Sequence, residues 1–432
     1  MTCAMRSGGS AAEAPCIELT ANSGAILSAG VPLHVHLATR CQHSRARRRG
    51  SPVRVPTGDS IAIVTETLEH FHPFIPAGGV GSRLWPLSRA DAPKFLLDLT
   101  GSGSSLLRAT YERLAPLSSN PVMVVTGRGH AGAVSQQLPE LSAKDLVLEP
   151  SPRDSGAAIG LACMLLERRD PGAVVGSFAA DHVIEPAEVF QDAVREAVIA
   201  ARTGKIVTIG IKPTSPSTAF GYIKADGLLG TDGAPSARAV EQFVEKPDED
   251  TARSYVASGD YLWNAGMFVA PAALMLEHLE ANEPELYAGL RVIADAWGTV
   301  RQDQVMSRTW EALPKIAIDY AVAEPAAAAG DVAVVPGDFS WDDVGDFAAM
   351  SRLNHVEESD DVAVLGENPR VLVDNSSGIV VSDTGRVVAL IGVQDIVVVD
   401  TPDALLVTTR EHAQRVKDTV NSLKAAGDTD VL

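Results

Sequence analysis

The amino-acid sequence predicts an α/β protein: a large domain built on a mixed, mostly parallel sheet, followed by a small β-rich domain. Three observations favour this fold. From Phe71 onward, short apolar runs alternate with helical patterns, as they do in α/β domains. A glycine-rich stretch directly follows the first run, at the position where open α/β sheets bind ligands. From about Asp360 the chain changes to short β-branched runs punctuated by Asn, Asp, Gly and Ser.

The elements of the large domain follow from apolar spacing and capping residues. Ser104 and Ser105 are good N-caps for a helix whose apolar residues recur at helical spacing from Leu106 to Leu114. A second helix is expected at 157–168, and Asp154 or Ser155 at its start could simply be its cap. A third helix is expected at 187–201, and strands at 74–77, 122–126, 146–148, 174–180, 206–211 and 240–247.

The small domain is expected to contain five short strands and a closing helix. Runs of β-branched residues predict the strands, and loop-forming residues separate them. The expected strands are 371–373, 379–381, 387–391, 396–399 and 405–408, and the expected helix is 411–425.

The length, charge and cysteines of the chain limit its domain number, its partners and its location. A chain of 432 residues has room for one large domain and a smaller one, which we place at 64–355 and 356–432. A net charge of −19 argues against nucleic acid or an anionic membrane as the main partner. No apolar run reaches the length of a membrane span, and no signal peptide is evident, so we expect a cytoplasmic protein. The four cysteines lack metal-ligand spacing, and Cys163 is expected in the core.

Residues 1–63 differ from the rest of the chain. They contain seven Arg and three acidic residues, and hence a net charge of +4, and they show no sustained periodicity. The basic cluster that ends at Gly50 could bind nucleic acid or act as a localisation signal, but the lack of periodicity favours a solvated, disordered tail.

The stretch from Phe74 to Leu96 predicts a phosphate site. Its three glycines permit sharp turns and close approach of the backbone to a ligand, and the following helix start would add N–H groups. Arg83 and Lys94 would supply full positive charges. A dinucleotide-binding loop fits poorly because Arg83 stands where a third glycine belongs, and no G-K-[ST] tripeptide supports a P-loop. A simple glycine-rich turn would leave both cations unexplained.

This stretch resembles the signature G-G-x-G-[ST]-R-L-x-P-L-[ST]-R, followed by P-K, of the sugar-1-phosphate nucleotidyltransferases. Its Leu84–Arg89 part is similar to that of the GDP-mannose pyrophosphorylases. The resemblance implies a Rossmann-like nucleotidyltransferase domain and a small C-terminal β-helix-like domain that serves packing and oligomerisation. In that family the phosphate loop lies near the N-terminus. This implies that residues 1–63 are a disordered or non-native extension and that the native start is a codon such as that of Val64.

The resemblance also implies the residues that bind nucleotide and metal. Asp181 follows an apolar strand, where it could be a turn residue or a Mg²⁺ ligand, and the resemblance favours the ligand. Asp343 is the implied second ligand, and His182 is expected to be structural. Arg83, Lys94 and Asp181 are the implied catalytic residues. The implied nucleotide-binding residues are Ala77, Gly78, Gly79, Gly81, Ser82, Arg83, Arg153, Ser155 and Asp181, although Arg153-Asp154-Ser155 departs from the family's Arg-Asn-Thr string.

Four further positions resemble the family's sugar-phosphate pocket: Gly221, Glu245, Lys246 and Asn264. Gly221 could equally be a bulge glycine, and Glu245 with Lys246 a surface ion pair. Because adjacent strand residues alternate, we expect Glu245 and Lys246 to face opposite sides of a strand that ends at Pro247. Asp319 is expected to have a structural or indirect role.

The resemblance implies transfer of GMP from GTP to mannose 1-phosphate by Mg²⁺-assisted in-line displacement, in a homodimer that binds neither nucleic acid nor membrane. An enzyme for another sugar 1-phosphate or nucleotide remains an alternative, because base choice depends on loops. A regulatory subunit that binds a sugar nucleotide without turnover is a second alternative. It would be expected to lack Arg83, Lys94 or a metal carboxylate, and all of these are present.

Overall fold

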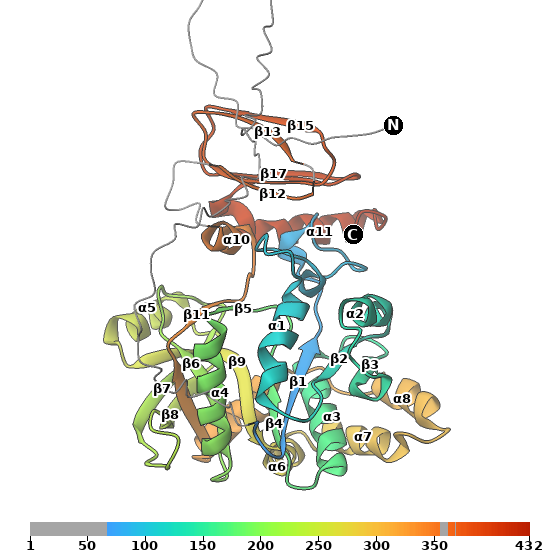
Figure 1. The fold of residues 1–432 in the computed structure, drawn as a ribbon, viewed down its shortest axis with the longest axis vertical. Coiled ribbons are helices and arrows are strands. Elements are labelled where there is room, and N and C mark those ends of the chain that lie inside the picture. The colour runs from blue at the N-terminus through green and yellow to red at the C-terminus, as the bar shows by residue number, and fades with distance from the viewer. Residues whose placement is uncertain (1–66, 355–361, 368) are drawn as a thin grey trace, which may run out of the picture. The chain divides into compact units, whose positions relative to one another are not determined.

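The structure, a computed structural model, describes residues 67–354, 362–367 and 369–432 (Figure 1). The predictions made for residues 1–63 lie outside the described residues. The described residues all belong to one compact unit, Gln42–Leu432. None of the helices within these ranges is both long and apolar enough to span a membrane.

The large domain is built on a nine-stranded mixed sheet. Its strand order is β3-β2-β1-β4-β9-β6-β10-β8-β7. The pairings make seven strands run in one direction, while β8 and β9 run in the other, which confirms a mixed, mostly parallel sheet. The strands are β1 (Phe71–Ala77), β2 (Met123–Gly127), β3 (Leu146–Glu149), β4 (Val174–Ser177), β6 (Ile206–Ile211), β7 (Gly221–Leu228), β8 (Arg238–Val244), β9 (Tyr261–Pro271) and β10 (Val332–Gly337).

Helices cover both faces of this sheet, and each face has its own apolar core. One core joins α3, α6 and α7 to residues such as Phe74, and the other joins α1 and α4 to residues such as Ile75. Neighbouring residues of β1 thus point to opposite faces, as the strand period requires. The helices are α1 (Leu106–Leu114), α2 (Ala131–Gln137), α3 (Asp154–Arg169), α4 (Ala187–Ala201), α5 (Glu249–Ser258), α6 (Ala272–Asn282), α7 (Pro284–Ala296), α8 (Gln302–Trp310), α9 (Glu324–Ala328) and α10 (Phe347–Leu353).

Two capping predictions had different outcomes. Ser105 caps α1, because its hydroxyl accepts a hydrogen bond from the N–H of Arg108 at 3.1 Å. At α3 the prediction was wrong: the residue before the helix is Arg153, which has no capping side chain. Asp154 is instead the first helical residue, with φ of +67°, and its side chain accepts from the adjacent N–H of Ser155. Cys163 in α3 is fully buried, as expected for a core residue.

The C-terminal region forms two short sheets of mainly parallel strands that stack as in a β-helix (Figure 1). One sheet contains β12 (Val362–Leu365), β14 (Gly378–Ser382) and β16 (Ile396–Asp400), with β17 (Leu405–Thr409) antiparallel at its edge; the other contains β13 (Arg370–Asp374) and β15 (Val387–Ile391). The closing helix α11 (Val416–Ala426) begins five residues later than predicted because 410–415 form a 3₁₀ helix. The core of this region includes Leu84 and Trp85 from the glycine-rich stretch.

Candidate active site

The parallel strands bring the predicted nucleotide residues to one edge of the sheet. Strands β3, β2, β1 and β4 are neighbours and run in the same direction, so their carboxyl ends meet at one edge. Ala77 ends β1 directly before the glycine loop, and Asp181 follows β4 by four residues. Arg153 and Ser155 follow β3 at the start of α3. The sequence predicted this common edge.

The glycine loop folds over Lys94. Gly79 and Gly81 have φ values of +80° and +77°, which L-residues with a side chain rarely adopt. A Cβ on Gly81 would lie 2.7 Å from Cβ of Lys94, and the N–H of Lys94 donates to the carbonyl of Val80 at 3.1 Å. The helix after the loop is only the 3₁₀ turn Ser82–Leu84. A phosphate at this position would therefore meet individual backbone N–H groups rather than the start of a long helix.

Lys94 lies between the two acids predicted to bind metal. The Lys94 side chain is 9% exposed, and its Nζ contacts Oδ2 of Asp181 at 2.6 Å. The same Nζ donates to the backbone carbonyl of Asp343 at 2.5 Å. Burial opposes ionisation of Asp181, but the positive charge of Lys94 and the hydrogen bond from Lys94 bring the pKa of Asp181 below its usual range. Burial raises the pKa of Asp343 to about 6.

A two-stranded ribbon explains how Asp181 and Asp343 come together although they lie far apart in the sequence. Strand β5 (Val183–Glu185) pairs antiparallel with β11 (Ser340–Asp342), and Val183 is directly opposite Asp342. The residue after Asp342 is therefore brought beside the residues before Val183. The sequence contained both short strands but no signal that they pair.

Two side chains that the sequence analysis did not emphasise support the segment that carries Asp181. Arg113 is buried and donates to the carbonyl of His182 at 3.0 Å, and burial lowers the pKa of Arg113 to about 10. The indole N–H of Trp341 donates to Nδ1 of His182 at 3.2 Å. Burial lowers the pKa of His182 to about 4, so the ring is neutral and can accept this bond. These contacts fit the structural role predicted for His182.

The four predicted sugar-phosphate residues also lie together. Gly221 pairs with Asn264 across β7 and β9, and a side chain on Gly221 would collide with the carboxylate of Glu245. Glu245 and Lys246 do not face opposite sides of a strand, so that prediction was wrong. Strand β8 ends at Val244, Lys246 has φ of +49°, and the two side chains form an ion pair with each other.

Among these four residues, the Asn264 side chain has hydrogen-bond partners in the protein, whereas one carboxylate oxygen of Glu245 has none among the described residues. The amide of Asn264 accepts from Thr208 at 2.9 Å and donates to Asp319 at 2.9 Å. Oε2 of Glu245 is buried without a hydrogen-bond partner among the described residues, and burial raises the pKa of Glu245. The hydrogen bond that Asp319 accepts from Asn264 agrees with an indirect role for Asp319. Glu245 offers an acceptor that a sugar hydroxyl could satisfy.

Arg153 and Ser155 are engaged with the protein rather than free. Arg153 forms an ion pair with Glu311 at 2.6 Å and also donates to its backbone carbonyl at 2.5 Å. The hydroxyl of Ser155 accepts from the N–H of Ile318 at 2.9 Å. Their assignment to the nucleotide site stays a prediction.

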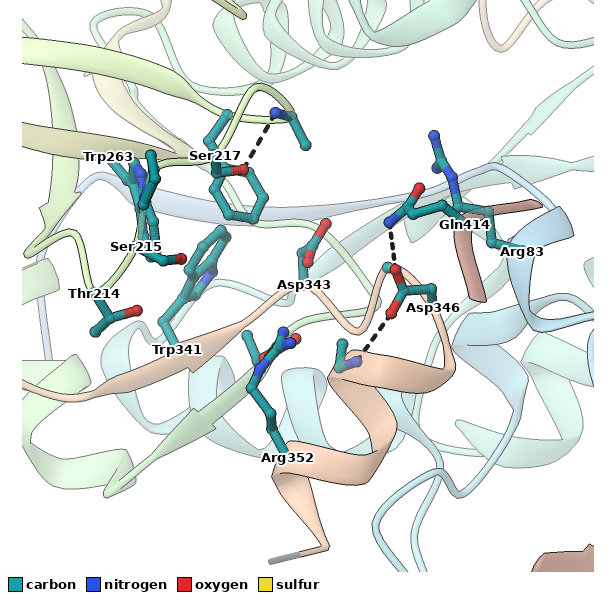
Figure 2. A pocket seen from close by; sticks show the side chains of 16 residues that line it. Arg83, Thr214, Ser215, Ser217, Trp263, Trp341, Asp343, Asp346, Arg352 and Gln414 are labelled. Carbon is teal, nitrogen blue, oxygen red and sulfur yellow. Dashed lines mark hydrogen bonds and ion pairs between the residues drawn. The ribbon is translucent and has the colours of Figure 1, made fainter. Parts of the chain in front are cut away.

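A cavity of about 480 Å³ opens beside Asp343 (Figure 2). Arg83 and Arg352 contribute positive charge to its lining, and Trp263 and Trp341 contribute aromatic surface. Arg352 also contacts the neighbouring carboxylate of Asp342 at 3.2 Å. The cavity therefore joins cations and carboxylates to flat apolar walls, a combination suited to a phosphorylated sugar or nucleotide.

Glu149 is a second buried acid that the sequence analysis passed over. It ends β3 at the same sheet edge, it is 8% exposed, and its Oε1 has no hydrogen-bond partner among the described residues. Burial raises the pKa of Glu149 to about 7. The sequence does contain a signal for Glu149, because it is an acidic residue at the end of an apolar strand. The same pattern was used to predict Asp181 and Asp343 as site residues, but Glu149 was not included.

Family models agree with a site that handles a nucleotide. The family model described as Nucleotidyl transferase matches residues 72–359, and one described as MannoseP isomerase/GMP-like beta-helix domain matches residues 368–423. The chain therefore belongs to the nucleotidyl transferase family.

The chain is similar to several proteins, some of which are named for mannose 1-phosphate. The mannose-1-phosphate guanylyltransferase of Escherichia coli K12 is 37% identical over 365 residues, which cover 82% of this chain and 74% of the relative. The xanthan biosynthesis protein XanB of Xanthomonas campestris pv. campestris ATCC 33913 is 39% identical over 364 residues, covering 83% and 74%. A crystal structure of a Thermus thermophilus protein, described as a mannose-1-phosphate geranyltransferase, is 34% identical with a TM-score of 0.71 and covers 82% of this chain and 99% of that one.

Proposed function

We propose that this protein is a mannose-1-phosphate guanylyltransferase, which transfers GMP from GTP to mannose 1-phosphate and releases pyrophosphate. The proposal is supported by membership of the nucleotidyl transferase family and by relatives named for this activity. The observation that carries it is the meeting of three distant segments: the glycine loop folds onto Lys94, and Lys94 contacts both Asp181 and Asp343.

The proposed reaction is an in-line displacement. A phosphate oxygen of mannose 1-phosphate attacks the α-phosphorus of GTP, a new P–O bond forms, and the bond to the leaving pyrophosphate breaks. The attacking oxygen is already anionic near neutral pH, so the reaction needs no nucleophile from the protein. The chain would contribute positioning and charge neutralisation.

The catalytic roles follow from charge. Arg83 and Lys94 would offset the negative charge of the triphosphate, with Ala77, Gly78, Gly79 and Ser82 presenting the backbone of the loop. Lys246 would orient the phosphate of the sugar, and the unpartnered oxygen of Glu245 would accept from a sugar hydroxyl. Arg153 and Ser155 would lie at the nucleotide, and Gly221 and Asn264 at the sugar.

Asp181 and Asp343 would hold Mg²⁺. Among the described residues no group of three or more His, Cys, Asp or Glu could hold a metal ion. Mg²⁺ is nevertheless commonly bound through one or two carboxylates, with substrate phosphates and water as its other ligands, so this pair fits it. When bound, the ion would neutralise charge on the phosphate oxygens.

Three wider expectations accompany this proposal. We propose that residues 64–355 form the catalytic domain and 356–432 the β-helix-like domain. We expect a homodimer, which sedimentation analysis would distinguish from a monomer. We also expect a cytoplasmic location, because the proposed substrate GTP is available there.

The test is pyrophosphate release with each of the four common NTPs, combined in turn with mannose 1-phosphate and glucose 1-phosphate. The proposal predicts the highest kcat/KM for GTP with mannose 1-phosphate, and GDP-mannose as the second product. A higher value for another pair would replace the substrate assignment. Binding of GDP-mannose without turnover of any pair would instead identify a sugar-nucleotide sensor.

A further inference from the structure

The guanidinium of Arg89, the last residue of the Leu84–Arg89 signature, is saturated by protein partners. It forms a bidentate pair with Asp403 at 2.7 and 2.9 Å and donates to the hydroxyl of Thr401 at 3.2 Å. It also donates to the carbonyls of Val431 at 2.6 Å and Pro86 at 2.8 Å. These bonds use all five N–H groups of an arginine. Arg89 therefore binds the C-terminal domain rather than a phosphate.

Trp85, from the same signature, also contacts the C-terminal domain. Trp85 is 8% exposed, and its indole N–H donates to the carbonyl of Val431 at 2.7 Å. The guanidinium of Arg89 lies 6.0 Å from the centre of this ring. Ser88, next to Arg89, contacts the glycine loop instead, because its hydroxyl donates to the carbonyl of Gly81 at 2.6 Å. The signature is thus bound to the glycine loop at one point and to the C-terminal domain at another.

A second link reaches the segment that carries Asp343. The side-chain amide of Gln414, in the 3₁₀ helix after β17, donates to the carboxylate of Asp346 (Figure 2). The other oxygen of Asp346 accepts from the N–H of Ala349 at 2.9 Å and caps α10. Asp346 is buried and lies three residues after Asp343. Both active-site segments are therefore hydrogen-bonded to the C-terminal domain.

We propose that the C-terminal domain positions the active site. Arg89, through Asp403, holds the glycine loop and Lys94, and Gln414, through Asp346, holds the segment of Asp343. Both are positioning residues, because neither acts on the substrates directly. This inference rests on the proposed function and extends it, since a domain expected only to pack and to oligomerise takes part in catalysis. A small displacement of charged groups can cost about 100-fold in rate, so such a link bears directly on turnover.

Asp403→Ala tests the Arg89 link, and amide hydrogen exchange gives a readout that needs no substrate. The N–H groups of Leu84 and Lys94 are hydrogen-bonded within the loop, to Gly81 and Val80. We expect exchange in residues 78–94 to become about tenfold faster, because hydrogen bonds to charged groups are lost. Asp418→Ala is the matched control: it removes the same charge from an exposed position of α11, and exchange in the loop should be unchanged.

Gln414→Ala tests the second link independently. Faster exchange is expected in residues 342–349, including the N–H of Ala349, while residues 78–94 keep the protection seen in the unsubstituted protein. Each variant should therefore loosen its own segment. Unchanged exchange at 78–94 in Asp403→Ala, or at 342–349 in Gln414→Ala, would overturn the inference.

Steady-state kinetics separate positioning from simple stabilisation. At a temperature where the far-UV circular dichroism of Asp403→Ala matches that of the unsubstituted protein, we expect kcat to fall by about 10- to 100-fold while KM for mannose 1-phosphate changes little. Asp403→Asn keeps one acceptor and should recover part of kcat. Faster exchange with an unchanged kcat would overturn the positioning role. If the unsubstituted protein itself shows no turnover, the proposed function fails, whereas the exchange experiment still decides whether the links exist.

Discussion

At the scale of single residues, Lys94 connects the glycine loop to both acids predicted to bind metal. Its ammonium is nearly buried and contacts one acid through its carboxylate and the other through its backbone carbonyl. The position of Lys94 after the glycine loop predicted its place at the triphosphate. The contact of the same ammonium with Asp181 and Asp343 could not be predicted, because it requires three segments to meet.

Replacing Lys94 by methionine should destabilise the protein without substrates. The substitution keeps the approximate length of the side chain but leaves the carboxylate of Asp181 without its cation and the backbone carbonyl of Asp343 without its donor. Breaking a largely buried ion pair costs about 3 kcal/mol or more. Urea unfolding would measure this loss. The matched control is Lys205→Met, whose partner Asp331 is 3.7 Å away at the surface and which should cost about 1 kcal/mol or less.

A double variant sharpens this prediction. Combining Lys94→Met with Asp181→Asn removes the unpaired charge as well as the cation. The double variant should therefore be more stable than Lys94→Met alone. Strict additivity of the two single effects would show that Lys94 and Asp181 do not interact.

Glu149 predicts a dependence of stability on pH. Its carboxyl is protonated in the folded protein up to a pKa of about 7, whereas the usual value is 4.5. Between these values only the unfolded chain ionises, so stability falls as the pH rises, by on the order of 3 kcal/mol in total. Glu149→Gln should abolish this component. Denaturant unfolding at pH 5 and pH 8 would measure it, and an equal loss of stability in both proteins would contradict the assignment.

At the scale of elements, many strands and the helices α1, α3, α4 and α11 could be predicted because they depend on local patterns, whereas α2 and α5 to α10 were not predicted. Helix α4 and strands β6 and β15 have the predicted bounds, since their apolar spacing and flanking loop residues are explicit in the sequence. The pairing of β5 with β11 could not be predicted, because short strands far apart in the chain carry no local signal of register. That pairing is what brings Asp343 to Asp181.

The glycine loop gives an element-level prediction with an internal control. Gly81→Ala would place a Cβ in a left-handed backbone position and 2.7 Å from the Lys94 side chain. We expect a loss of about 2 kcal/mol in the free energy of unfolding and displacement of Lys94. Gly78→Ala meets no atom within 4 Å and needs no positive φ, so its stability should match that of the unsubstituted protein. Equal stability of both variants would contradict the described loop.

At the scale of the whole molecule, the site depends on more than the sheet edge that the sequence predicted. The glycine stretch supplies Leu84 and Trp85 to the core of the C-terminal region. The resemblance explained why this signature exists near a phosphate site, but it did not separate the residues that face the ligand from those that bind the other domain. Arg83 lines the cavity, while Arg89, six residues later, is fully occupied by Pro86, Thr401, Asp403 and Val431.

The most direct test of the whole account is GDP-mannose formation from GTP and mannose 1-phosphate with Mg²⁺, measured by chromatography for the unsubstituted protein and for Asp181→Asn. We expect the unsubstituted protein to form GDP-mannose and pyrophosphate in equal amounts. We expect Asp181→Asn to lose about 1,000-fold in rate, equivalent to about 4 kcal/mol of transition-state stabilisation. A rate for Asp181→Asn equal to that of the unsubstituted protein would contradict the proposed site.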